Sequence, residues 1–98
     1  MDKDITILKL LDQLDILMHE YSIRYIDLWE VDLCAIGLVK GDRLMYISTY
    51  NYVNNAEIRY DIEVEIINDQ GERVLTRKVM KNISTDALIN EIIYQFEA

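Results

Sequence analysis

The sequence has very few of the residues that build covalent, metal-binding and catalytic centres. Its 98 residues include one cysteine, one histidine and no proline. A single cysteine cannot form an internal disulfide, and Cys34 lies in an apolar run that predicts a small buried hydrophobe. A structural zinc site takes four cysteine or histidine ligands, and the spacing of His19 and Cys34 suggests no thiol–base pair. We therefore expect no catalytic residue, no metal, no cofactor and no enzymatic activity.

Long apolar runs are also absent. The longest runs contain only a few residues, far fewer than the ~20 that a membrane-spanning helix needs. The chain begins with acidic residues, whereas a secretory signal begins with positive charge. These features predict a cytoplasmic protein that does not contact a membrane.

Basic residues are few compared with acidic ones. The chain has 10 Lys and Arg residues against 18 Asp and Glu residues, which gives a net charge of −8. Nucleic-acid binding depends on Lys and Arg that neutralise phosphates, so we do not expect a nucleic-acid partner. The densest basic group is short and interleaved with apolar residues, and we expect it to pair with carboxylates on neighbouring strands. It consists of Arg73, Arg77, Lys78 and Lys81.

The residues that are present predict one small folded domain over residues 1–98. Apolar residues make up 51% of the chain, enough for a modest core. They recur at helical spacing over about residues 5–21, where Asp2 or Asp4 can cap the helix. A second helix is expected over about residues 86–97, with Ser84 or Thr85 as its cap.

A tight hairpin is predicted around residues 39–44. Gly41 can supply the positive φ that the first central position of a type II′ turn requires. In the resulting register Leu38 faces Met45, Ile36 faces Ile47, and Gly37 faces Tyr46, whose ring the glycine would accommodate.

Residues 57–67 alternate between apolar and polar side chains, which predicts a strand with one buried and one solvated face. Residues 68–71 then match a turn with Gly71 in the left-handed region, followed by a return strand over about residues 72–80. In this register Ile66 faces Val74, and Glu63 pairs with Arg77.

Residues 23–39 do not alternate cleanly. We favour a strand with a bend or bulge near residues 30–32, and helix remains the alternative. The predicted fold is therefore α+β: an N-terminal helix, an antiparallel sheet of four or five strands built from two hairpins, and a C-terminal helix, with both helices on one sheet face. On the opposite face the registers place four apolar residues, which predict either two-sided burial or a dimer contact: Val39, Leu44, Leu75 and Val79.

Two acidic clusters and two tyrosines are the candidate partner-binding residues. A negative patch raises association rates and selects basic partners, and tyrosine is common at binding hot spots. The alternative interpretation is that the charges are ordinary solvated strand faces. Trp29 is either a core anchor or an interface anchor. The candidate residues are Asp27, Glu30 and Asp32, then Asp61, Glu63 and Glu65, with Tyr50 and Tyr52.

No motif identifies a family. In size, acidity and lack of catalytic groups, the chain resembles the small inhibitor or immunity proteins that neutralise bacterial toxins. This resemblance implies a protein that binds a basic partner, such as a nuclease toxin domain, and covers its active site. One alternative is a dimeric chaperone or adaptor for another protein. Another is a small ligand-binding domain or enzyme, which would need a pocket of about 300 Å³ or more with convergent polar groups, near His19 or a buried carboxylate.

Overall fold

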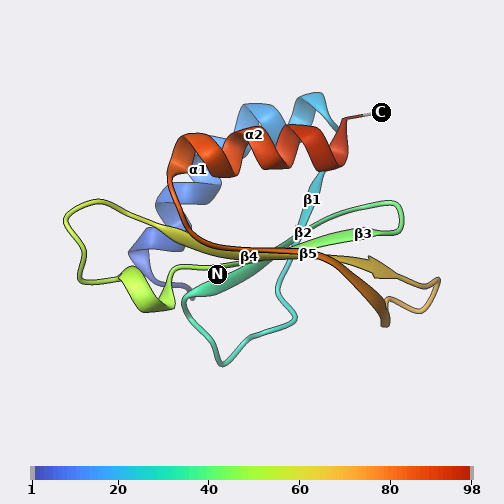
Figure 1. Ribbon diagram of the computed structural model, residues 1–98, viewed down its shortest axis with the longest axis horizontal. Coiled ribbons are helices and arrows are strands. Elements are labelled where there is room, and N and C mark those ends of the chain that lie inside the picture. The colour runs from blue at the N-terminus through green and yellow to red at the C-terminus, as the bar shows by residue number, and fades with distance from the viewer. Residues whose placement is uncertain (1, 98) are drawn as a thin grey trace.

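Two helices flank five strands along the chain, and the strands form one antiparallel sheet in the order β1-β2-β3-β4-β5. The computed structural model describes residues 2–97, and both helices lie on the same face of the sheet (Figure 1). The predicted α+β fold is thus confirmed, with five strands. The elements are α1 (Ile5–Glu20), β1 (Arg24–Ile26), β2 (Ala35–Lys40), β3 (Arg43–Ser48), the short 3₁₀ helix η1 (Tyr50–Tyr52), β4 (Tyr60–Ile67), β5 (Arg73–Ile83) and α2 (Thr85–Phe96).

Each helix begins at a side-chain cap that the sequence predicts. The Asp4 carboxylate accepts a hydrogen bond from the Thr6 amide at 3.0 Å, and the Ser84 hydroxyl accepts one from the Ala87 amide at 3.1 Å. Caps of this kind stabilise a helix by about 1 kcal/mol. The apolar stripes of the helices then pack on the sheet, burying Leu10 and Leu14 of α1 and Leu88 and Ile92 of α2.

The β2–β3 hairpin has the predicted register. Leu38 pairs with Met45, and Gly37 pairs with Tyr46. Gly41 has a φ of +60°, as the predicted turn requires, because this conformation carries no steric penalty in glycine. Short-range turn chemistry therefore sets this part of the sheet.

The β4–β5 hairpin has the predicted turn but a different register. Gly71 has a φ of +78°, and its amide donates to the Asn68 carbonyl at 2.9 Å. Beyond the turn, β5 uses one residue more than β4 at each of three irregularities, so β4 has 8 residues and β5 has 11. The predicted Glu63–Arg77 pair is therefore wrong, since Glu63 lies opposite Val79.

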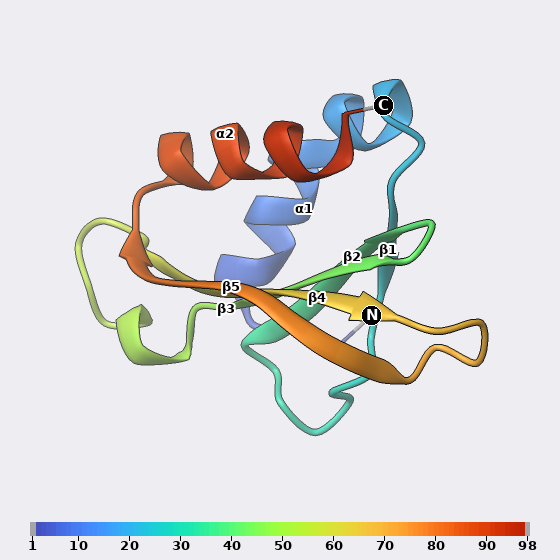
Figure 2. The ribbon, with the colours of Figure 1, turned by 45° about the vertical axis from the view of Figure 1, so that its right-hand side comes forward.

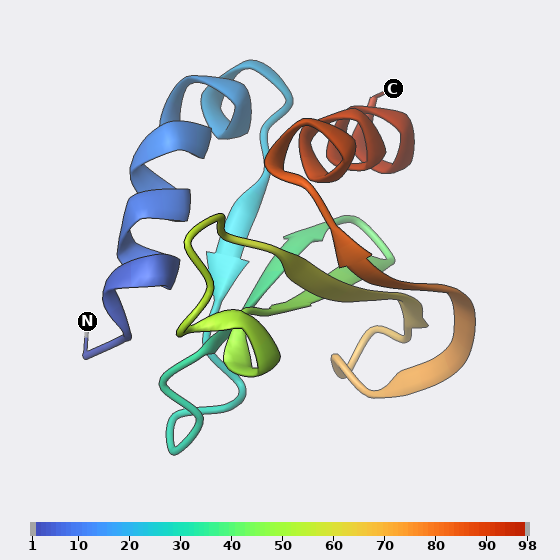
Figure 3. The same cartoon turned by 60° about the vertical axis from the view of Figure 1, so that its left-hand side comes forward.

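The bulges also correct a second predicted pairing. Ile66 lies opposite Leu75 rather than Val74, which puts Leu75 on the other face of the sheet from the one predicted. Each bulge bends the strand and increases its twist. Figure 3 shows the resulting curl of β5 away from α2 toward the hairpin turn.

The segment 23–39 is neither one bent strand nor a helix. It forms the three-residue β1, then the irregular residues 27–34, and then β2. We call residues 27–34 the covering loop, and the sheet face opposite the helices the open face. The loop extends on the side of the sheet away from both helices (Figure 2).

The core lies between the helices and the sheet, and a second layer of burial lies on the open face. Val39 and Leu44 are buried there, so the predicted two-sided burial is correct for these residues. Leu75 and Val79 on β5 are exposed. The sheet is therefore covered on both faces at β2 and β3 but not along β5.

Candidate functional site

The covering loop packs Trp29 onto the open face at Gly37. A Cβ atom added to Gly37 would lie 3.0 Å from side-chain atoms of Ile26, Leu44 and Trp29. The glycine therefore makes room for these side chains, whereas the sequence predicted room for the ring of Tyr46. Trp29 is half-buried and serves as the anchor of the loop.

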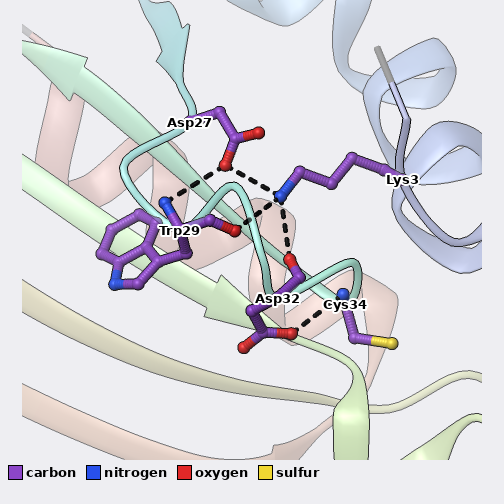
Figure 4. A network of polar contacts seen from close by, with 5 residues as sticks. All are labelled: Lys3, Asp27, Trp29, Asp32 and Cys34. Atoms are coloured by element: carbon purple, nitrogen blue, oxygen red, sulfur yellow. Dashed lines mark hydrogen bonds and ion pairs between the residues drawn. The ribbon is translucent and has the colours of Figure 1, made fainter.

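Lys3 clamps the loop to the N-terminal end of α1 (Figure 4). Its ammonium group donates to the Trp29 carbonyl at 3.1 Å and to the Asp32 carbonyl at 2.8 Å. It also forms an ion pair with the Asp27 carboxylate at 2.8 Å, and the Lys3 side chain has 0% exposure. A buried ammonium needs such partners, and three oxygen atoms from one loop supply them.

Two aspartates close the loop on itself. The Asp27 carboxylate accepts from the Trp29 amide at 3.2 Å, and the Asp32 carboxylate accepts from the Cys34 amide at 3.0 Å. These contacts are Asx turns, which short polar side chains favour. Asp27 and Asp32 therefore fix the conformation of the loop and also contribute to its negative charge.

Cys34 is the last residue of the covering loop and is half-buried, so the prediction of a buried hydrophobe is only partly correct. Burial raises the pKa of its thiol, and the negative charge of Asp4 raises it further. A thiol with a raised pKa is a poor nucleophile near neutral pH.

One carboxylate of the first predicted acidic cluster and two of the second lie near Tyr46. The Tyr46 ring packs edge-on against Trp29, with centroids 4.7 Å apart and an angle of 69° between the planes. Burial raises the pKa of Tyr46, and the negative charges of Asp32, Glu63 and Asp61 raise it further, although a hydrogen bond with Ser48 opposes this. Carboxylates from the covering loop and from β4 therefore act on one aromatic centre on the open face.

Asp61 is a structural residue. It is only 7% exposed, so the prediction that it lies on a solvated face is wrong. Its carboxylate accepts hydrogen bonds from the Tyr52 hydroxyl at 2.5 Å, the Asn51 amide at 3.0 Å and the Asn82 backbone amide at 3.0 Å. Burial alone would raise the pKa of Asp61, but these hydrogen bonds outweigh it and lower the pKa. Asp61 thus ties η1 to β5, where Asn82 has a positive φ.

Glu65 is also buried, at 3% exposure, and here too the predicted solvated face is wrong. Arg73 forms an ion pair with it at 3.4 Å, but the Oε2 atom of Glu65 accepts no hydrogen bond within residues 2–97. Burial raises the pKa of Glu65, and Glu63 raises it further, while Arg73 acts in the opposite direction. The bulged β5 brings Arg73 over this carboxylate, which alternation alone does not reveal.

The remaining candidate residues differ in accessibility. Glu30 and Tyr50 are exposed, whereas Glu63, Asp27, Asp32 and Tyr52 are half-buried. The accessible acidic groups of the open face therefore come from the covering loop and from Glu63. Sequence reasoning missed Lys3 and Tyr46. The Asp-x-Trp and Asp-x-Cys spacings were the available signal for the loop.

Two of the four basic residues of β5, Arg73 and Lys78, form ion pairs, and only one of the two pairs lies on a neighbouring strand. Arg73 pairs with Glu65 on β4, as expected for a cross-strand pair. Lys78 instead pairs with Glu91 of α2 at 2.9 Å and lies 5.6 Å from the centre of the Tyr94 ring. These contacts fasten β5 and α2 and leave no basic patch centred on these two residues.

A groove of about 950 Å³ runs between α1 and β1, with Leu8, Leu11 and Tyr25 among its apolar lining. Its volume exceeds what a small ligand needs. Its polar groups include Asp15 and His19, with 3.9 Å between the Asp15 Oδ1 and His19 Nδ1 atoms. Both side chains are mostly exposed, so they do not form a desolvated site. Within residues 2–97, no group of three or more His, Cys, Asp or Glu side chains is placed to hold a metal ion.

Comparisons with protein-family models, with curated protein sequences and with solved structures gave no match. None of the helices in residues 2–97 has the length and hydrophobicity needed to cross a membrane.

Proposed function

We propose that this chain is a protein-binding inhibitor that docks its open face onto a basic protein partner. The observation that carries the proposal is that Asp32 of the covering loop and Glu63 of β4 both lie near Tyr46, whose ring packs against Trp29. Aromatic side chains supply contact area, and the surrounding carboxylates select a positively charged surface. The net charge of −8 attracts such a partner at long range and so raises the rate of encounter.

The inhibitor acts by covering the partner's active site or substrate path, without chemistry of its own. A nuclease toxin domain is a suitable partner, because an enzyme that binds phosphates presents Lys and Arg at its active site. The half-buried carboxylates Asp32 and Glu63 would occupy the positions that the phosphates take. This role is that of the immunity proteins that the chain resembles in general character.

For the test, the wild-type chain is used to capture a partner protein at low salt from an extract of the cells that produce the chain. The captured protein is released at high salt and purified, and its binding to variants of the chain is then measured. The double variant E30K/E63K should lower its association rate by about tenfold or more and weaken the salt dependence. The double variant D12K/E20K changes the net charge by the same amount at two exposed positions of α1, on the helix side of the sheet. It is the charge-matched control and should leave binding nearly unchanged. Equal association rates for E30K/E63K and wild type would contradict the proposal.

A dimeric chaperone or adaptor is the second candidate, and one observation favours it. β5 is an edge strand that exposes Val74, Leu75 and Val79. Exposed apolar side chains on an edge strand favour self-association. Sedimentation separates the two functions, since a stable dimer favours the chaperone and a monomer favours the inhibitor.

A further inference from the structure

The covering loop has three aliphatic side chains that are about half or more exposed to solvent. Leu28 is 53% exposed, Val31 is 98% exposed and Leu33 is 47% exposed, and all three lie within six consecutive residues. Single exposed apolar residues are common on protein surfaces, but a group on one loop marks an interaction site.

We infer that the covering loop is the docking element of this protein, and that its aliphatic tip enters an apolar depression bordered by Lys and Arg on a protein partner. This inference rests on the proposed function and names the part of the open face that makes the central contact. Val31 is the outermost of the three side chains by exposure.

The loop is held in one conformation before any partner arrives. Lys3 binds it through three oxygen atoms, and Asp27 and Asp32 close its turns. The Leu33 carbonyl also accepts a hydrogen bond from the Asp4 amide at 2.8 Å. Ordering a flexible loop costs affinity, so a loop that is already ordered binds more tightly through the same contacts.

Charge defines the chemistry of the partner. Residues 27–34 include three acidic side chains and no basic one, and Glu30 is exposed beside the aliphatic tip. A pocket with a basic rim complements this arrangement. A second copy of the chain does not, because it would bring two chains of charge −8 together at their most acidic loops.

The decisive experiment measures binding of the purified, salt-released partner to the double variant L28S/V31S. Affinity should fall by about 30-fold or more, as expected for the centre of an interface. I16S removes a similarly exposed aliphatic side chain from α1, outside the loop, and should change affinity by less than about twofold.

A second variant tests whether Lys3 is a positioning residue. K3M should increase amide hydrogen exchange in residues 29–34 while β2 and β3 keep their protection, and it should also weaken binding. K40M removes another lysine that bonds a backbone carbonyl, that of Phe96 at 2.9 Å, and should do neither. Unchanged exchange in the loop of K3M would show that the clamp does not hold it.

The outcomes separate this inference from the function on which it rests. If E30K/E63K weakens binding but L28S/V31S does not, the docking element is wrong and the inhibitor proposal stands. If no protein is retained in a salt-dependent way, both fail. If L28S/V31S instead abolishes a dimer of this chain in sedimentation, the loop binds a second copy and the proposed partner is wrong.

Discussion

The two faces of the sheet are covered by different physical means. On the helix face, α1 and α2 bury a continuous apolar cluster that includes Leu10, Ile62 and Ile92. On the open face, an irregular loop is held by the buried ammonium of Lys3, and the carboxylates of Asp61 and Glu65 are buried among polar partners.

This difference teaches how a small domain divides its tasks. Apolar contacts are non-directional and tolerate small shifts, so they supply most of the stability. Buried polar groups are costly unless each finds its partner, so they fix one geometry. We expect the helix face to dominate the free energy of unfolding and the open face to fix the shape that a partner meets.

The largest effect should come from the helix face. Ile62→Ala removes a fully buried side chain and should lower the free energy of unfolding by about 2–5 kcal/mol. Leu44→Ala on the open face should cost less, because the covering loop can settle into the space. Urea unfolding of both variants measures the difference. Equal losses would break the contrast between the two faces.

A smaller effect is expected where the loop meets the sheet. Gly37→Ala adds a Cβ atom 3.0 Å from Trp29, Ile26 and Leu44, and should cost about 1–3 kcal/mol by overpacking. The fluorescence of Trp29, the only tryptophan, should shift toward that of an exposed indole. In a Trp29→Ala background the same substitution should cost less. An identical cost in both backgrounds would mean that Trp29 does not occupy this space.

The buried carboxylates should give opposite pH dependences. The pKa of Asp61 is lowered, so its stabilising contribution is present above its ordinary value of 3.8 and is lost as the pH falls through the lowered pKa. The pKa of Glu65 is raised, so its contribution is present below its ordinary value of 4.5 and is lost as the pH rises through the raised pKa.

Asp61→Asn should therefore cost about 1–2 kcal/mol near neutral pH and less in acid. Glu65→Gln should cost more in acid than near neutral pH. Chemical unfolding of both variants and the wild type, from acid to neutral pH, tests whether the two stability losses change with pH in opposite directions. Parallel pH profiles for the two variants would show that the carboxylates are held in equivalent environments.

The smallest effect on stability is expected at the tip of the covering loop. Val31→Ser changes a side chain that is 98% exposed. The substitution should therefore change the free energy of unfolding by no more than about 0.5 kcal/mol, and the melting temperature should shift only slightly. Differential scanning calorimetry measures this. A larger loss would indicate that Val31 packs within the fold and is not available to a partner.

Local signals predicted much of this structure. The caps at Asp4 and Ser84, the turns at Gly41 and Gly71, and the β2–β3 register all depend on residues close in sequence, and all are confirmed. The bulges of β5 were missed because an extra residue in a strand leaves no compositional mark. Because the predicted register contained no bulge, the β4–β5 pairs predicted beyond the hairpin turn are shifted along β5 from the observed ones.

The candidate site was predicted less well, because burial depends on distant residues. Alternation places Asp61 and Glu65 opposite an apolar face but does not show what covers them. Asn82 and Tyr52 enclose Asp61, and Arg73 reaches Glu65 only because β5 is bulged. The clamp joins Lys3 to Asp32 across 29 positions of sequence. No pattern within either segment predicts that contact.

The bulges of β5 also determine where the sheet stops growing. An exposed edge strand of 11 residues with apolar side chains is the kind of segment that seeds fibrils. Between its irregularities, the longest run of β5 in unbroken register is Lys78–Met80, and the opposite edge, β1, has only three residues. Neither edge offers a foreign strand more than one short stretch of regular backbone, so any association through the exposed valine and leucine side chains of β5 is limited to side-chain contacts and does not extend the sheet.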